Sequence, residues 1–149
     1  MKYLLVSAGI FAGELFLKGH VEKNWPMHRD KAALKGCLRL RRYHNKGAFL
    51  NLGENRRGLV AAISAGLTLG LLVFSVLTFF QGENRLLSAG LSLLLGGAFS
   101  NTYDRLRRKY VVDYFSIHTG IGFIDRIVFN LADFAVMAGV MLCVIASEG

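Results

Sequence analysis

Proline and cysteine are scarce in this chain. Pro26 is the only proline among 149 residues, so proline kinks are excluded from helices elsewhere in the chain. Cys37 and Cys143 are the only cysteines. One lies in a polar stretch and the other in an apolar one, which argues against a disulfide, and neither belongs to a metal-ligand spacing. The HExxH pattern of zinc peptidases and the G-x-S-x-G pattern of serine hydrolases are also missing.

Apolar residues, by contrast, are abundant. They make up 53% of the chain, and the mean hydropathy is +0.40, which is more apolar than an ordinary soluble domain. They fall into four blocks separated by polar stretches, and a membrane-spanning helix needs about 20 apolar residues. We therefore predict an all-α membrane protein with a single domain, 1–149. Its core is a four-transmembrane-helix bundle over residues 3–17, 59–80, 86–100 and 127–146, in which the two shorter blocks borrow flanking residues.

Two polar surface loops, residues 18–58 and 101–126, are expected on one side of the membrane. The segment 36–52 mixes apolar and basic residues with loose alternation, and the run YVVDYFSIH, residues 110–118, is also strand-like. We therefore expect a small surface β-sheet on the side of these loops, where the candidate active-site residues described below are also expected.

The net charge of +8 is distributed unevenly. Of the 18 lysines and arginines, 11 lie in residues 18–58 and five in 101–126, leaving only Lys2 and Arg85 for the other side. Such a surface favours anionic headgroups, so membrane lipids are expected partners. Nucleic acid is not expected, because no nucleic-acid-binding motif accompanies the charge. Taken alone, the charge bias places these loops in the cytoplasm.

Acidic residues in or beside apolar blocks are functional candidates, because an ionisable group at membrane depth is costly. Four residues meet this description: Glu14, Asp104, Asp113 and Asp133. Asp133 lies about seven residues into the fourth block, and we predict that Asn130, three residues earlier, shares its helix face. That face must point into the bundle or towards water.

Asp113 and Asp133 are candidates for a catalytic pair if the fold brings them together. Two carboxylates in one desolvated site repel each other, so one keeps a proton while the other is ionised. Aspartic proteases use this state for general acid–base hydrolysis. The alternative is that Asp133 pairs with a basic residue such as Arg105 or Arg126, and that Asp113 is an ordinary interfacial charge.

Three motifs point to one family. GGAFSNTYDRLRRKYVVDYF at 96–115, FNLADF at 129–134 and NKGAF at 45–49, together with the four apolar blocks and the chain length, resemble the lipoprotein signal peptidase (signal peptidase II) family. The resemblance implies a membrane aspartyl endopeptidase with Asp113 and Asp133 at the catalytic positions. It also implies supporting or substrate-binding roles for a further set: Asn45, Asn101, Asp104, Arg105, Asn130 and Glu14.

The resemblance further implies a substrate and a location. Such enzymes remove signal peptides from bacterial prolipoproteins on the N-terminal side of the lipid-modified cysteine, so the expected partner is a diacylglyceryl-modified prolipoprotein signal peptide. No metal or organic cofactor is expected, and the enzyme is expected to be a monomer. It is expected in the bacterial cytoplasmic (inner) membrane as a multi-pass protein, with both termini in the cytoplasm and the active site near the outer surface. We adopt this orientation over the one given by loop charge.

The sequence departs from the family pattern in two motifs. The first helix reads GELFLK, with Glu14 and Lys18, where the family has a D-Q-x-x-K pattern. NKGAF lacks one alanine of the family's N-x-G-A-A-F. The change at Glu14, together with the reversed loop charge, keeps a second function open, a non-catalytic relative that binds lipidated signal-peptide helices. A third reading, a small transporter with Asp133 as proton relay, is disfavoured because four helices without an internal repeat do not match known transporter designs.

Overall fold

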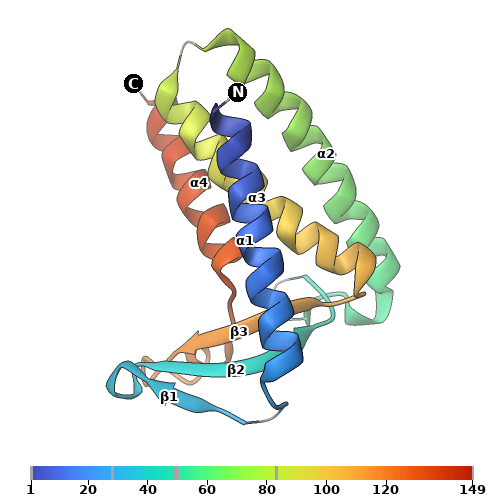
Figure 1. Ribbon diagram of the computed structural model, residues 1–149, viewed down its shortest axis with the longest axis vertical. Coiled ribbons are helices and arrows are strands. Elements are labelled where there is room, and N and C mark those ends of the chain that lie inside the picture. The colour runs from blue at the N-terminus through green and yellow to red at the C-terminus, as the bar shows by residue number, and fades with distance from the viewer. Residues whose placement is uncertain (1, 28, 49–50, 83, 149) are drawn as a thin grey trace.

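The computed structural model describes residues 2–27, 29–48, 51–82 and 84–148. Four helices run beside one another, and a small antiparallel sheet lies across one end of them (Figure 1). The helices are α1 (Lys2–Asn24), α2 (Arg57–Gln81), α3 (Arg85–Arg107) and α4 (Leu131–Ser147). The strands are β1 (Lys31–Ala33), β2 (Leu38–Asn45) and β3 (Val111–Ile117). The described residues also form short 3-10 turns: η1 (Leu34–Gly36), η3 (Glu54–Arg56) and η4 (Ile124–Arg126).

This architecture confirms a mostly helical chain with a small sheet, but three predicted helix ends are wrong. The first helix continues from residue 17 to Asn24, and the third from residue 100 to Arg107. The fourth begins at Leu131 rather than at residue 127. Hydropathy marks where the chain leaves an apolar environment, whereas a helix ends where its hydrogen bonds end. The polar extensions of α1 and α3 stay helical because they pack against the sheet or form ion pairs.

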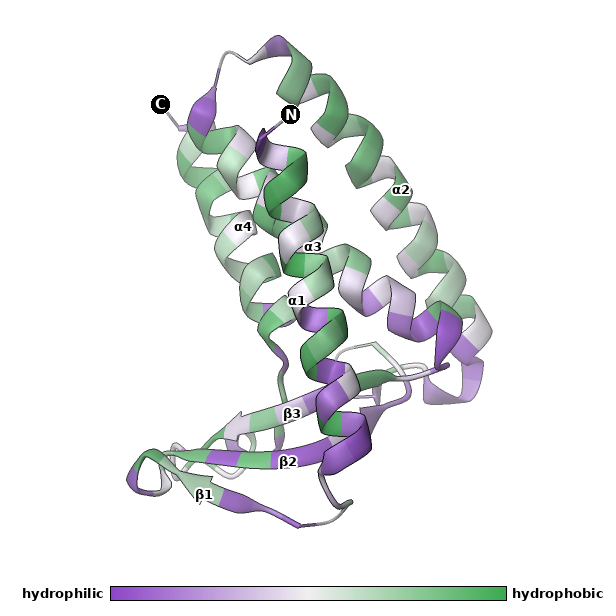
Figure 2. Cartoon of the chain, in the orientation of Figure 1, coloured by the Kyte–Doolittle hydropathy of each residue, from purple (hydrophilic) through white to green (hydrophobic). Residues whose placement is uncertain are grey.

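The apolar side chains of the outer helices point away from the protein. Figure 2 shows α2 as apolar along most of its length, and many of its large residues, such as Leu67 and Phe80, are exposed. Two helices, Lys2–Asn24 and Glu54–Gln81, are long and apolar enough to cross a membrane, and Leu131–Ser147 is a shorter apolar helix. α3 falls outside this set because serines, glycines and Asp104 occupy most of its buried face and lower its hydropathy.

Small residues let α3 occupy the centre of the bundle. A Cβ atom added to Gly97 would lie 2.5 Å from the carbonyl oxygen of Ala132 on α4, and one added to Gly139 would lie 2.6 Å from the Leu94 backbone nitrogen on α3. A Cβ on Gly96 would lie 2.8 Å from Ile10 on α1. Such close backbone approach is typical of membrane helix packing, and it brings the start of α4 next to α3.

The sheet is ordered β1-β2-β3, with both pairs antiparallel. Its register places Tyr43 opposite Asp113, after an irregularity between Leu40 and Tyr43 in β2. Phe129 extends the far side of β3 through a bridge to Phe115. A small core, in which Val21 of α1 packs on Val112 and Tyr114 of β3, holds the sheet against the helices. The sheet thereby places Asp113 near the N-terminal end of α4.

Candidate active site

Asp133 lies in the first turn of α4, and Asn130 is the N-cap of that helix. The Asn130 Oδ1 accepts a 3.0 Å hydrogen bond from the Asp133 backbone N–H, and Asp133 Oδ2 accepts one of 3.0 Å from the Asn130 backbone N–H. The two residues therefore lie together, as expected, but the expected position of Asp133 about seven residues into the helix is wrong, because Asp133 is the third residue of α4 and Asn130 precedes it. Asparagine is a favoured N-cap, and the preceding Phe129 is held extended by its bonds to Phe115, so the helix begins only after Asn130.

Two asparagines connect the candidate aspartates. Asn130 Nδ2 donates to Asp113 Oδ1 at 2.7 Å, and Asn101 Nδ2, from α3, donates to Asp133 Oδ1 at 2.8 Å. Asn130 Nδ2 also contacts Asn101 Oδ1 at 3.3 Å. Residues from β3, α3 and the start of α4 thus form one continuous hydrogen-bonded group, as the motif residues predict.

Both aspartates line the same cavity, whose volume is about 530 Å³. One part of its wall is polar and includes Asn45, Asn101 and Arg105. The other part is mainly apolar, and it is formed by β3, the segment before α4 and α4 itself: Val111, Ile127, Val128, Phe129, Val136 and Met137. The cavity therefore offers a pair of carboxyl groups beside an apolar surface, which suits a substrate with both a peptide bond and an apolar segment.

Asn45 and Arg105 lie between the candidate aspartates and the loop after β2. Asn45 lines the cavity beside Asp113, and its Oδ1 accepts from the Gly47 backbone N–H at 3.2 Å. Arg105 Nη2 donates to the Gly47 carbonyl oxygen at 3.3 Å, and its Nη1 to the Asn101 carbonyl oxygen at 3.4 Å. Asn45 and Ala48 of the NKGAF motif thus line the cavity, and Gly47 contacts Arg105 of its wall, whereas Phe49 lies outside the described residues.

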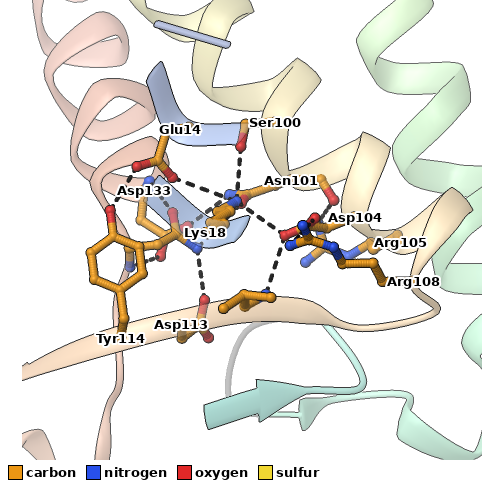
Figure 3. Close-up of polar contacts among 12 residues, drawn as sticks. Glu14, Lys18, Ser100, Asn101, Asp104, Arg105, Arg108, Asp113, Tyr114 and Asp133 are labelled. Atoms are coloured by element: carbon orange, nitrogen blue, oxygen red, sulfur yellow. Dashed lines mark hydrogen bonds and ion pairs between the residues drawn. The ribbon is translucent and has the colours of Figure 1, made fainter. Parts of the chain in front are cut away.

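Asp104 and Glu14 lie behind the cavity wall rather than in it. Asp104 is 1% exposed; its Oδ2 accepts from the Val112 backbone N–H at 3.2 Å, and its Oδ1 lies 3.1 Å from Arg108 Nη1. Glu14 Oε1 accepts a 2.6 Å hydrogen bond from the Tyr114 hydroxyl. Both carboxylates also contact the ammonium of Lys18 (Figure 3). Their part is to hold β3 and α1 against α3.

Lys18 is the buried charged residue that sequence reasoning did not include among the site residues. It is 1% exposed, although it lies at the polar end of the first apolar block. The available signal was its spacing of four from Glu14, which places the two on one helix face and matches the lysine of the family pattern.

The environment of Asp113 favours its neutral form. Burial raises its pKa, and the nearby Asp133 carboxylate raises it further. Hydrogen bonds from Asn130 and Asn45 and the charge of Lys18 act in the opposite direction, and the result is a pKa of about 8. This direction favours a protonated Asp113 at neutral pH, the state that one carboxyl of two in a shared site takes in aspartic proteases.

The alternative arrangement from the sequence, a structural ion pair at Asp133, does not occur. Among the described residues, neither Arg105 nor Arg126 lies within ion-pair distance of Asp133. Asp113 is only 2% exposed, so it is not an ordinary interfacial charge either. The structure thus favours a shared polar site over two separate structural charges.

Comparison with known proteins identifies the family. The model of the family described as signal peptidase (SPase) II matches residues 6–148. This chain belongs to that family. The lipoprotein signal peptidase of Lactobacillus johnsonii is 30% identical over 94% of this chain and 87% of its own length. That of Geobacillus thermodenitrificans is 31% identical over 94% of this chain and 85% of its own length.

The fold agrees with this membership. A bacterial membrane enzyme solved by the in meso method at 2.3 Å resolution superposes with a TM-score of 0.83 at 21% identity, covering 99% of this chain and 87% of that one. The resemblance seen in the motifs is confirmed, and the chain is a signal peptidase II type peptidase.

Proposed function

We propose that this peptidase removes the signal peptide from diacylglyceryl-modified prolipoproteins, on the N-terminal side of the lipid-modified cysteine, with Asp113 and Asp133 as its catalytic pair. The observation that carries the proposal is their shared geometry: both side chains line one cavity and both accept hydrogen bonds from a group of two asparagines. The family membership supplies the reaction class, and the cavity supplies the place for it.

The chemistry that this pair supports is hydrolysis through general acid–base catalysis. One carboxylate accepts a proton from a water molecule that attacks the scissile carbonyl carbon, and the other carboxyl group donates a proton to the carbonyl oxygen. Asn45, Asn101 and Asn130 hold the two acids in place, and Arg105 holds the loop that carries Gly47. None of these steps uses a metal or an organic cofactor.

The apolar part of the cavity supports a lipid-modified substrate. Val136 and Met137 of α4 form part of the cavity wall, and Met137 is 53% exposed. Further along α4, Val140, Met141 and Val144 are exposed as well. The cavity is therefore continuous with an apolar helix surface, along which a signal-peptide helix and acyl chains would reach the dyad from the membrane.

We further propose that the chain is one membrane domain, 1–149, in which all four helices span the bilayer. α1, with 23 residues, is about 34 Å long and α4, with 17, about 26 Å, close to the thickness of the hydrocarbon core, about 30 Å. Figure 1 shows both termini at the end of the bundle away from the sheet, as four spans require. The protein is then a multi-pass monomer of the bacterial cytoplasmic membrane, with both termini inside and the dyad near the outer surface.

The basic loops fit this orientation if they contact lipid. Residues 18–58 contain 11 lysines and arginines but only Glu22, Asp30 and Glu54 as acids. Without the buried Lys18, the ten other basic residues and these three acids leave a net charge of +7. A surface next to the bilayer with this charge attracts anionic headgroups. The reversed charge bias then reflects binding of membrane lipids at the outer surface, around the entrance for the substrate.

The test is cleavage by the full-length protein in lipid nanodiscs. A prolipoprotein with a diacylglyceryl-modified cysteine is incubated with the protein, and the products are identified by mass spectrometry, with the unmodified prolipoprotein as control. We expect a fragment that begins at the modified cysteine and no cut in the control. Binding of the lipidated substrate without a new amino terminus would instead identify a non-catalytic relative.

A further inference from the structure

Lys18 of α1 is a buried cation that the proposed mechanism does not use. Its Nζ donates to Ser100 Oγ and to Asn101 Oδ1, both at 2.8 Å. It also lies 3.3 Å from Asp104 Oδ2 and 3.6 Å from Glu14 Oε2, as Figure 3 shows. The two carboxylates compensate its charge, which is the usual condition for burying a lysine. It does not line the cavity, so any effect on the reaction passes through a neighbour.

That neighbour is Asn101, whose side-chain amide has one accepting end and one donating end. An ammonium group can only donate hydrogen bonds, so the carbonyl oxygen of the amide must face Lys18. The NH2 group is then directed to the opposite side, where Asn101 Nδ2 donates to Asp133 Oδ1 at 2.8 Å. A half-turn of the amide would set donor against donor at Lys18 and acceptor against carboxylate at Asp133.

The orientation of the Asn101 amide determines what Asp133 can accept. Its Oδ1 accepts from Asn101, and its Oδ2 accepts from the Asn130 backbone N–H at 3.0 Å. Both oxygens therefore act as acceptors, the role of an ionised carboxylate, at the N-terminus of α4, where backbone N–H groups favour negative charge. Asp113, by contrast, is 2% exposed and accepts on Oδ1 from Asn130. The two acids are thus unequal before substrate binds.

We propose that Lys18 is a positioning residue: by orienting the amide of Asn101, it keeps Asp133 as the dyad member that receives the proton of the attacking water. This inference rests on the proposed function and assigns its two protonation roles. The water oxygen bonds to the carbonyl carbon, one water proton passes to Asp133, and the Asp113 proton passes to the carbonyl oxygen. When the C–N bond breaks, Asp133 gives its proton to the leaving nitrogen and a diol hydroxyl returns a proton to Asp113.

The first test is Lys18→Met in the full-length protein, with initial rates measured in nanodiscs on a diacylglyceryl-modified prolipoprotein. We expect kcat to fall about 100-fold, the size of effect that a misplaced catalytic group produces, while KM changes less than about threefold. Lys2→Met is the matched control, because Lys2 is an exposed lysine of the same helix that lies outside the basic loops, at the end of the bundle away from the sheet. It is expected to leave both constants unchanged.

A second variant separates this effect from a loss of folding. Lys18→Met leaves Glu14 without its ion-pair partner and Asp104 with Arg108 alone, so Glu14→Gln/Lys18→Met is prepared as well, which removes one charge of each sign. Rates are normalised to the monodisperse folded fraction of each variant. The proposal expects the same loss of kcat in both. Recovery of the wild-type kcat in the double variant would show that uncompensated charge was the cause, and it would overturn the proposal.

A double-mutant cycle with Asn101→Ala tests the route through the amide. If Lys18 acts through Asn101, adding Lys18→Met to Asn101→Ala lowers kcat by no more than about twofold, because coupled residues are not additive. The same 100-fold loss in both backgrounds would show that Lys18 acts without Asn101, and the inference would be wrong. The proposed function fails separately, if the wild-type protein does not cleave the substrate at all.

Discussion

Asn130 Nδ2 donates a 2.7 Å hydrogen bond to Asp113 Oδ1 from the residue that caps α4. The same asparagine accepts from the backbone N–H of Asp133 at 3.0 Å. One side chain therefore begins the helix that carries one acid and holds the other acid in place. This arrangement explains how a strand residue and a helix residue, 20 positions apart in the chain, come to share a site.

Asn130→Ala is predicted to reduce both stability and turnover. Loss of the N-cap costs about 0.5–2 kcal/mol of unfolding free energy, and loss of the donor to Asp113 lowers kcat by a factor on the order of 100. The measurements are thermal unfolding in detergent and the cleavage rate. Asn84→Ala is the control, since Asn84 caps α3 through an equivalent bond to the Leu87 N–H and does not line the cavity. A similar fall in kcat for both variants would contradict a specific role of Asn130.

The dyad also predicts a basic limb in the pH profile. Asp113 has a pKa of about 8 because burial, and then the Asp133 carboxylate, disfavour its charged form. The mechanism needs Asp113 protonated, so kcat/KM is expected to fall as pH rises through about 8. The cations near the pair are Arg105 from α3 and Arg126 beside α4, which line the cavity, and Lys18 from α1, whose charge acts on Asp113 in the opposite direction to burial. A profile that stays level up to pH 10 would contradict a protonated Asp113.

The same shift predicts how stability depends on pH. The folded-state pKa of Asp113 is raised above the value near 3.9 of an unfolded chain, so the folded protein binds more protons between pH 4 and pH 8. The contribution of Asp113 is complete below pH 4 and is lost as pH rises through about 8. As pH rises from 4 to 8, the unfolding free energy of Asp113→Asn should therefore increase by about 1–3 kcal/mol relative to that of the wild type, measured by unfolding at several pH values. A difference that shrinks as pH rises would contradict the assignment.

Close packing between α3 and α4 gives a prediction about Gly97. A Cβ there would lie 2.5 Å from the Ala132 carbonyl oxygen, one residue before Asp133. Gly97→Ala is expected to cost about 1–3 kcal/mol of stability, as overpacking does, and to lower kcat because Asp133 shifts. Gly66→Ala on α2 is the control, because a Cβ there meets no atom within 4 Å. The unfolding midpoints and cleavage rates of the two variants are measured. Equal values would show that α3 and α4 can move apart without strain.

The residues of the site were largely predictable, whereas their local geometry was not. The motifs placed Asp113, Asp133, Asn101 and Asn130 in one group because their order and spacing matched a family. Hydropathy could not show that Asn130 caps a helix, since FNLADF is apolar enough to be read as helix interior. That boundary depends on the bridge between Phe129 and Phe115, which is a contact between distant segments.

The elements of the fold were also largely predictable, whereas their ends were not. Four apolar blocks gave four helices, and strand-like runs at 36–52 and 110–118 gave β2 and β3. The extension of α1 was missed because Lys18 reads as the start of a solvated loop. In the structure it is buried between two carboxylates supplied by α1 and α3. Such compensation by distant charges has no signature in a local window of sequence.

The most direct measurement of the account is the cleavage rate of two isosteric variants, Asp113→Asn and Asp133→Asn, on a diacylglyceryl-modified prolipoprotein. Asp125→Asn is the control, because Asp125 bonds to Thr119 and His118 and does not line the cavity. We predict that each dyad variant, while remaining folded and able to bind substrate, loses at least about 1,000-fold in kcat, and that the control keeps the wild-type rate. Normal processing by either dyad variant would contradict catalysis by these two aspartates.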